Sequence, residues 1–287
     1  MNNCLINGVA TDYLTVHDRA IHYGDGLFET ILWHNRKLYF WPQHYLRLKQ
    51  SADKIKLACP EESLLIADIE NLLSDAKSEQ AYAIKVIITR GTSLRGYQFD
   101  KKPMTTRIAT ISAIESDYSS LLSQHLLSGD LTVCEQQVSI NENLAGLKHL
   151  NRLENVLARN ESTIVKNSNV VDGLMLNAHQ YVIECTTSNV FSVKDKILYT
   201  PKLNQSGVQG VMRDAIIAIA KNNNINVTLS DMTIEKIKSM DEVFITNSLI
   251  GMKAINHFVD VKFSTRNVTE IIFKILLENM DSHGQVI

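Results

Sequence analysis

Two long segments rich in β-branched residues, 81–89 and 106–113, constrain the fold of this chain more than any other feature. Ile, Val and Thr favour strands because their branched side chains pack well on a pleated surface. Two segments before them, around 45–55 and over 62–77, have apolar residues at spacings of three and four, as on one face of a helix. Strands and helices therefore do not alternate regularly, which argues against a doubly wound parallel sheet and favours an α+β fold.

Shorter elements complete this pattern. Further strands are expected at 4–6, 27–33, 37–41, 131–138, 174–177, 181–184, 190–193 and 197–200, and further helices at 147–160, 211–221, 234–238 and 270–279. A polar stretch at 116–123 is interpreted as an interdomain linker. It separates a smaller N-terminal α+β domain, 1–115, from a larger C-terminal domain, 124–287.

Composition excludes several classes of protein. The 287 residues are enough for two domains with real cores, and the formal net charge of −2 argues against a broad nucleic-acid surface. The chain has no apolar run of membrane-spanning length and no signal-peptide pattern, so a cytoplasmic protein without a membrane or nucleic-acid partner is expected. The four cysteines and nine histidines show no metal-ligand spacing, so no metal is expected.

Lys148 is the first candidate for chemistry. Leucines recur at the spacing of a buried helix face over the expected helix 147–160 (Leu147, Leu150, Leu153 and Leu157). That helix would place Lys148 in its first turn, where the positive end of the macrodipole disfavours a cation and lowers the pKa of an ammonium group. A lysine with a lowered pKa is an amine nucleophile. The alternative is an ordinary surface lysine.

Glu184 and two anion-binding turns are further candidates. Glu184 ends a β-branched strand, where a carboxylate opposite a pyridine nitrogen would keep that nitrogen protonated. The alternative is a solvated glutamate at a strand end. The glycine-punctuated loop 206–210 leads into the helix 211–221, whose first backbone N–H groups suit an anion. Asn247 and Ser248, after a strand over 242–246, offer further donors. Both turns could equally be merely tight turns.

Five segments together carry a family resemblance. They are Tyr23-Gly-Asp-Gly-Leu-Phe-Glu-Thr30, His44-Tyr-Leu-Arg-Leu48, Lys148, Glu184 within an E-x-x-x-x-N-x-F string, and Gly210-Val-Met-Arg213. In this order they resemble the fold-type IV pyridoxal-phosphate enzymes, whose two-domain architecture is that of D-amino-acid aminotransferase, and the resemblance spans nearly the whole chain.

The resemblance implies a cofactor and its contacts. The cofactor is pyridoxal 5′-phosphate, attached as a Schiff base to Lys148, which is also the catalytic residue. Arg47, the backbone amides of Val211 and Met212, and the Asn247–Ser248 turn would hold its phosphate, and Glu184 would face its pyridine nitrogen. The resemblance also implies a homodimer acting on a small-molecule substrate.

Three stretches narrow the resemblance to one branch of the family. Residues 145–153 (A-G-L-K-H-L-N-R-L), 90–97 (R-G-T-S-L-R-G-Y) and 199–201 with 207–213 resemble the branch that cleaves 4-amino-4-deoxychorismate to 4-aminobenzoate and pyruvate, a step of folate biosynthesis. Leu153 stands where branched-chain aminotransferases usually carry a tyrosine, which counts against that activity. Two differences from the pattern are the absence of glycine at 93 and 94 and of a proline near Lys253.

The substrate of that branch carries two carboxylates, so cationic or amide donors should line its side of the pocket. Arg95, Tyr97 and Arg152 are the candidates, and Phe28 and Thr30 are candidates for a pocket wall. Arg152 could instead be a helix-surface arginine paired with an acid, and Phe28 could instead belong to the core.

Two other functions stay open. A D-amino-acid or branched-chain-type aminotransferase would share Lys148, Arg47 and Glu184. A non-catalytic binding protein could retain the fold, but the intact Lys148 counts against it.

Overall fold

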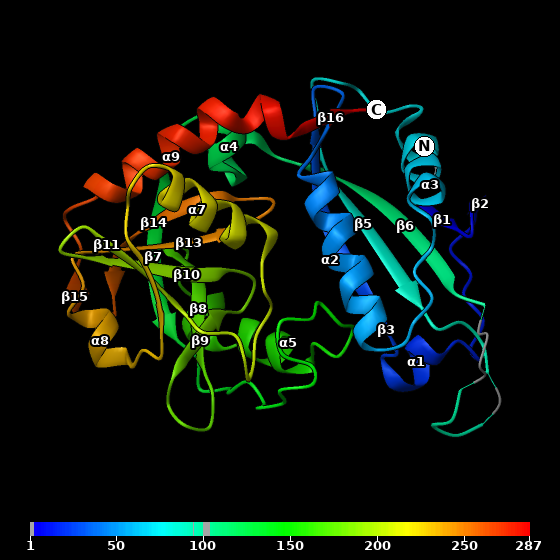
Figure 1. Cartoon of the computed structure of the whole chain (residues 1–287), viewed down its shortest axis with the longest axis horizontal. Coiled ribbons are helices and arrows are strands. Elements are labelled where there is room, and N and C mark those ends of the chain that lie inside the picture. The colour runs from blue at the N-terminus through cyan, green and yellow to red at the C-terminus, as the bar shows by residue number, and fades with distance from the viewer. Residues whose placement is uncertain (1–2, 94, 100–103) are drawn as a thin grey trace. The chain divides into compact units, whose positions relative to one another are not determined.

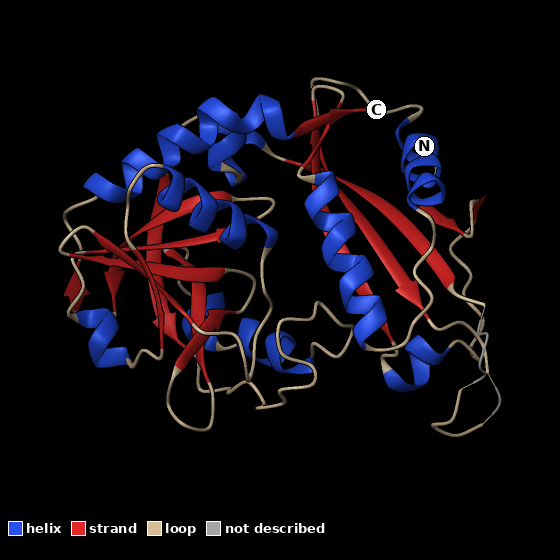
Figure 2. Cartoon of the chain, viewed as in Figure 1, coloured by secondary structure: helices blue, strands red, loops and turns tan. Residues whose placement is uncertain are grey.

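The computed structural model describes residues 3–93, 95–99 and 104–287, so Leu94 of the 90–97 segment lies outside the described residues. Two compact units make up the chain (Figure 1). Unit 1 consists of Met1–Ser116, Lys148–Asn151 and Asp281–Ile287, and unit 2 of Asp117–Leu147 and Arg152–Met280. Each unit combines helices with a sheet, which is the expected α+β class (Figure 2).

The expected domain boundary differs from these units in two respects. Lys148–Asn151, expected in the C-terminal domain, belongs to unit 1, as does the C-terminal Asp281–Ile287. The expected polar linker contains a 3-10 turn, η1 (Ser116–Tyr118), and a short helix, α4 (Ser120–Ser123). Leu121 of α4 is buried, so this stretch packs within unit 2 rather than forming an open linker.

Unit 1 is built on an antiparallel sheet. Within the described residues it has seven strands in the order β16-β4-β3-β5-β6-β1-β2. The strands are β1 (Cys4–Ile6), β2 (Val9–Ala10), β3 (Gly26–His34), β4 (Lys37–Tyr39), β5 (Ala81–Thr89), β6 (Thr106–Ile114) and β16 (Gly284–Val286); the helices are α1 (Arg19–Tyr23), α2 (Trp41–Lys54) and α3 (Glu62–Leu73). Ile31 and Ile84 from the sheet pack with Leu48 of α2 and Leu65 of α3, and this apolar layer is the core of unit 1.

Unit 2 is built on a mixed sheet. Among the residues described, its main path runs β12-β11-β10-β13-β14-β7-β8-β9, with β15 paired to β14. The strands are β7 (Leu127–Val133), β8 (Val170–Leu176), β9 (Val182–Cys185), β10 (Asn189–Lys194), β11 (Ile197–Pro201), β12 (Val227–Ser230), β13 (Glu242–Asn247), β14 (Gly251–Phe258) and β15 (Val261–Lys262). The remaining helices are α5 (Leu153–Arg159), α6 (Ser162–Val165), α7 (Val211–Asn222), α8 (Ile234–Lys238) and α9 (Asn267–Asn279), and η2 (Met280–His283) follows α9. Pairing is parallel at β7–β8, β7–β14 and β11–β12 and antiparallel elsewhere.

The expected helix 147–160 is wrong over its first six residues. The segment around Lys148 is extended and pairs with β3: the Phe28 N–H donates to the Lys148 carbonyl (2.9 Å) and the Leu150 N–H to the Gly26 carbonyl (3.0 Å). The short β4 covers only the far end of β3, so the backbone groups near Gly26 need another partner, and this segment supplies it. The helix-dipole argument for Lys148 therefore does not apply.

The leucine stripe used for that helix is also wrong. Leu153 is 69% exposed and Leu157 is 52% exposed, whereas Leu147 is buried outside any helix. Across the described part of the chain, no helix has both the length and the apolar character needed to cross a membrane.

Candidate active site

Lys148 has its position fixed by the strand-like pairing of its own backbone. Its neighbour His149 forms an antiparallel bridge with Leu27, and its carbonyl accepts the Phe28 N–H. The half-buried side chain brings its Nζ to 4.4 Å from the centre of the Phe28 ring. The main-chain hydrogen bonds to β3 thus hold the backbone from which this amine extends.

Phe28 and Thr30 share one face of β3, since side chains alternate along a strand. Both are half-buried, whereas Leu27 and Ile31 on the opposite face are core residues. The core alternative for Phe28 is therefore not what the structure shows. Its ring contacts the Lys148 ammonium and also lies 5.0 Å from Nζ of Lys85.

Arg47 is held by a buried carboxylate, Glu29. From α2, the Arg47 Nε donates to Glu29 Oε1 at 2.8 Å and Nη2 donates to Oε2 at 2.5 Å. His44, one helical turn earlier, places Nδ1 at 2.6 Å from the same Oε2. Glu29 and His44 are fully buried, and the Arg47 side chain is 13% exposed. Two of the guanidinium nitrogens of Arg47 are thus directed by Glu29.

Burial and charge together keep the cluster of Glu29, His44 and Arg47 in one charge state. Burial alone would raise the pKa of Glu29, but the charge and hydrogen bonds of Arg47, with the His44 contact, outweigh it and lower the pKa to about 2. Burial lowers the pKa of His44, and the charges of Arg47 and Lys148 act in the same direction against the Glu29 contact. Glu29 is therefore ionised and His44 neutral at pH 7. Within the described structure the buried His44 Nε2 has no hydrogen-bond partner.

Glu184 is a buried residue of β9, so it is not a solvated strand-end glutamate. It is 4% exposed, and its Oε2 accepts the Val208 N–H at 2.8 Å. The adjacent Gly207 has a φ of +82°, and an added Cβ would lie 3.3 Å from the same oxygen. Gly146, two residues before Lys148 in sequence, pairs with this loop through the Gly207 carbonyl (2.9 Å). One edge of the Glu184 carboxylate is thus fixed by a backbone amide.

Gly210 precedes α7 as its N-cap and provides no side-chain cap for the first turn. Val211 and Met212 are buried, so only their backbone amides could face an anion. A Cβ at Gly210 would lie 2.1 Å from Asn189 Oδ1, which explains the glycine by close approach. Arg213 turns away, and its Nη2 donates to the Pro201 carbonyl at 3.0 Å. The uncapped N–H groups at this helix start suit a phosphate.

Asn247 has a structural task at the turn between β13 and β14. Its Oδ1 accepts the N–H groups of Leu249 and Ile250, both at 2.9 Å, and its Nδ2 donates to the Thr187 carbonyl at 3.2 Å. Ser248 is half-buried at the tip of the same turn. The amide of Asn247 therefore ties this turn to the one that follows Glu184.

Arg152 contacts the main chain next to Lys148 in sequence. It is the N-cap residue of α5, and its Nη2 donates to the Leu147 carbonyl at 2.6 Å. This bond closes the loop that contains Lys148. A substrate contact of Arg152 remains a prediction.

Arg95 and Tyr97, two of the candidates for substrate binding, belong to unit 1. Both side chains are exposed, Tyr97 by 85%, on the segment that joins β5 to β6. The Tyr97 ring packs at 5.3 Å from the ring of Tyr23. The structure thus presents them as outward side chains, and their substrate contacts also remain predictions.

Two residues of the cluster were not selected from the sequence as site residues. Glu29 and His44 stand within the quoted strings, but nothing local shows that they meet. The available signal was the spacing of His44 and Arg47, three apart on one helix face. Their shared acceptor, Glu29, lies 15 and 18 residues away in sequence, on a strand.

Residues 26–258 match the model of the class IV aminotransferases, and the chain belongs to that family. Among its relatives, the aminodeoxychorismate lyase of Vibrio harveyi is 32% identical over 251 residues, 88% of this chain and 89% of the relative. A D-alanine aminotransferase of Listeria monocytogenes is 28% identical over 249 residues, 86% of this chain and 83% of the relative.

A solved structure agrees with both the fold and the lyase resemblance. The crystal structure of 4-amino-4-deoxychorismate lyase from Pseudomonas aeruginosa superposes with a TM-score of 0.86 at 28% identity, covering 97% of this chain and 99% of that one. The Escherichia coli branched-chain aminotransferase, at 21% identity and a TM-score of 0.80, shares the fold.

Proposed function

We propose that this protein is a pyridoxal-phosphate-dependent lyase that converts 4-amino-4-deoxychorismate to 4-aminobenzoate and pyruvate. The observation that carries the proposal is Lys148, whose backbone is held by hydrogen bonds to β3, within a segment whose sequence resembles the lyase branch. The 32% identity to a lyase along 88% of the chain supports the choice of reaction.

The residues present fit the cofactor. Its phosphate calls for cationic and N–H donors, and Arg47, oriented by a buried carboxylate, and the uncapped start of α7 are such donors. Its ring nitrogen calls for an acid, and Glu184 is a buried carboxylate. Its aldehyde calls for an amine, which Lys148 supplies. The turn of Asn247 and Ser248 would border the phosphate.

Pyridoxal phosphate, when bound, supplies a carbonyl that reacts with the substrate amine and a ring that accepts electrons from the bond being broken. Glu184 would hold a proton on the pyridine nitrogen of the cofactor. Lys148 Nζ takes the proton from C4 of the substrate. The C3–O bond of the substrate then breaks. The enolpyruvyl group leaves and takes up a proton to become pyruvate, and the six-membered ring of the substrate becomes aromatic.

Substrate binding is assigned to donors on the chain. Arg95, Tyr97 and Arg152 would bind the two carboxylates, and Phe28 with Thr30 would line the pocket. We further propose that the protein acts as a homodimer in the cytoplasm.

The test is a product assay. Purified protein loaded with pyridoxal phosphate and given aminodeoxychorismate should release 4-aminobenzoate and pyruvate in equal amounts without an added keto-acid acceptor. A variant with Lys148→Ala should release neither. Absence of both products with the wild-type protein would contradict the proposal.

An aminotransferase is the second candidate, favoured by the 28% identity to D-alanine aminotransferase. With D-alanine alone, an aminotransferase would accumulate the pyridoxamine form of the cofactor and release pyruvate. A lyase should leave the cofactor spectrum unchanged under the same conditions.

A further inference from the structure

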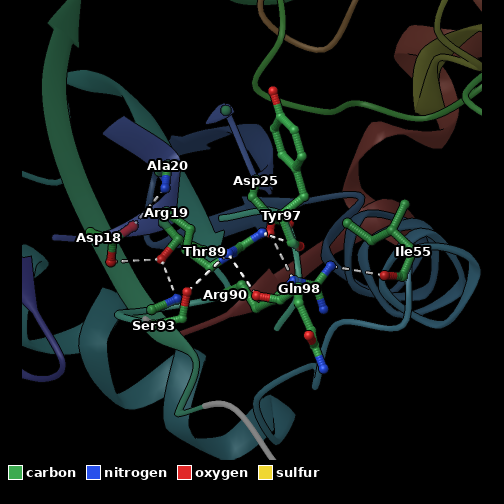
Figure 3. Close-up of polar contacts among 12 residues, drawn as sticks. Asp18, Arg19, Ala20, Asp25, Ile55, Thr89, Arg90, Ser93, Tyr97 and Gln98 are labelled. Atoms are coloured by element: carbon green, nitrogen blue, oxygen red, sulfur yellow. Dashed lines mark hydrogen bonds and ion pairs between the residues drawn. The ribbon is translucent and has the colours of Figure 1, made fainter. Parts of the chain in front are cut away.

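Arg19, the first residue of α1, is a buried arginine whose guanidinium meets the main chain of segment 96–98 (Figure 3). It is 4% exposed. Its Nη1 donates to the carbonyls of Gly96 (3.0 Å) and Gln98 (3.4 Å), and its Nη2 donates to the carbonyl of Tyr97 (3.0 Å). Three consecutive carbonyls therefore converge on one side chain.

The guanidinium is itself anchored through Asp25. The Asp25 Oδ2 accepts from Arg19 Nε and from Arg90 Nε, both at 2.8 Å. Arg90 in turn donates to the carbonyls of Lys56 (2.6 Å) and Ile55 (2.9 Å). Burial would raise the pKa of Asp25, but the hydrogen bonds and charges of the two arginines outweigh it and lower the pKa. Asp25 thus stays ionised between two buried cations.

The start of α1 is tied to the end of β5. Asp18 caps α1 through the Ala20 N–H, and its second oxygen accepts from the Thr89 hydroxyl at 2.9 Å. The Arg19 N–H donates to the Gly91 carbonyl at 2.9 Å. The first residues of α1, from which Arg19 reaches segment 96–98, are therefore held by hydrogen bonds to Thr89 and Gly91.

The side chains of the held segment point outward. Tyr97 is 85% exposed although its carbonyl is bound to Arg19, and in Figure 3 its ring points away from the buried cluster. Arg95 is exposed as well. Here a fixed backbone displays a cation and a phenol to solvent.

We propose that Arg19 is a positioning residue for substrate recognition: it holds the backbone of segment 96–98 so that Arg95 and Tyr97 are prearranged for a carboxylate-bearing substrate. The inference rests on the proposed function, since it assigns the outward side chains to the ligand of that reaction. Groups ordered before binding lose less conformational freedom on binding, so the contribution of Arg19 falls on substrate affinity. Proton transfer by Lys148 should be little affected.

Steady-state kinetics give the first test. Arg19→Met should raise KM for aminodeoxychorismate about tenfold or more while kcat changes less than about threefold, and Arg19→Lys should be intermediate. The matched control is Arg107→Met on β6, which removes another arginine–aspartate pair of unit 1, with Asp68 of α3. A KM for Arg19→Met equal to that of Arg107→Met would overturn the inference. If Arg19→Met does not fold by circular dichroism, the comparison of Arg19→Lys with Arg107→Lys decides in the same way.

Limited trypsin digestion gives a readout that does not depend on activity. Arg95 is exposed but next to a held backbone, and a protease needs an extended, mobile substrate. Cleavage after Arg95, identified by fragment mass, should be at least about tenfold faster in Arg19→Met than in the wild-type or Arg107→Met protein. Equal rates would show that Arg19 does not hold the segment and would overturn the inference.

A double-mutant cycle tests whether Arg19 acts through the displayed side chains. In an Arg95→Ala/Tyr97→Ala background, Arg19→Met should raise KM by less than about twofold. A full tenfold effect in that background would contradict a positioning role.

Failure of the proposed function is distinguishable from failure of this inference. If the wild-type protein forms no 4-aminobenzoate but transaminates D-alanine, the lyase proposal fails. The same variants are then compared by KM for 2-oxoglutarate, which is also a dicarboxylate. The inference about Arg19 stands or falls on that comparison together with the cleavage rates.

Discussion

Replacing Glu29 with glutamine should destabilise the protein strongly, although the two side chains have the same shape. Glu29 is fully buried and receives two hydrogen bonds from Arg47 and one contact from His44. Glutamine removes the negative charge and places an N–H₂ group against one of these partners. The Arg47 guanidinium, 13% exposed, is left without its counter-charge. Breaking a buried ion pair from one side costs about 3–5 kcal/mol.

The lowered pKa of Glu29 gives a second estimate of how much this residue contributes to stability. Lowering it from 4.5 to about 2 on folding corresponds to about 3 kcal/mol of stability, at ~1.4 kcal/mol per pH unit. Because the folded state has the lower pKa, this contribution is complete above about pH 5 and is lost as the pH falls towards 2. The stability difference between wild type and Glu29→Gln should shrink over that range.

The assay is thermal and urea unfolding of the cofactor-free protein. Glu29→Gln should lower the apparent Tm by roughly 6–15 °C at pH 7, from about 2–3 °C per kcal/mol. Glu278→Gln, an exposed glutamate that faces Lys274, is the control and should change Tm little. Adding Arg47→Met to Glu29→Gln should recover part of the loss, because the unpaired charge is removed. A Tm for Glu29→Gln within about 2 °C of wild type at pH 7 would refute the reasoning.

Three further predictions concern the buried Asp172, the phosphate contact of Arg47 and the assembly state. Asp172, 1% exposed, accepts hydrogen bonds from the Thr186, Thr187 and Ser188 side chains, so Asp172→Ala should cost about 3–5 kcal/mol in urea unfolding. The exposed Asp260→Ala is the control and should change the free energy of unfolding far less; equal effects would contradict this account. Arg47→Ala should weaken pyridoxal-phosphate binding by about 2–3 kcal/mol in a titration, and an unchanged affinity would remove Arg47 from the phosphate site. Sedimentation should show a homodimer, and a fully active monomer would refute that assembly.

The local sequence was sufficient to predict an element where its residue pattern clearly favoured one type of secondary structure. The β-branched run at 81–89 is β5 with the predicted bounds, and the apolar spacing after Pro42 predicted α2. The helix at 234–238 also agrees with α8. In these elements the residue that favours the local conformation is also the residue that the core buries.

Sequence reasoning failed where tertiary pairing decided the conformation. The leucines around Lys148 have helical spacing, yet hydrogen bonds to Gly26 and Phe28 hold that segment extended, and these partners lie more than a hundred residues earlier. The strand predicted at 131–138 is β7, Leu127–Val133. The long β14 was missed because Lys253, Asn256 and His257 interrupt its apolar pattern.

For the site, too, the sequence indicated residue types and motifs but not long-range contacts. Residue types and motif order were enough to select Lys148 and Glu184, whose roles remain predictions. The contacts of Arg19 with residues 96–98 span 77 to 79 positions, and no local pattern could indicate them. Long-range hydrogen bonds to main-chain carbonyls leave no mark on the identity of the acceptor, because every residue carries the same carbonyl.

The central claim is that Lys148 is the amine that binds the cofactor, and chemical trapping tests it most directly. Wild-type protein loaded with pyridoxal phosphate is reduced with borohydride, digested and mapped by mass spectrometry. Lys253 is the informative competitor, since it is half-buried and burial lowers the pKa of its ammonium. We predict a single stoichiometric adduct on the peptide containing Lys148, and none in Lys148→Ala. An adduct on Lys253 or another lysine of the wild-type protein, or a trapped cofactor in Lys148→Ala, would contradict the account.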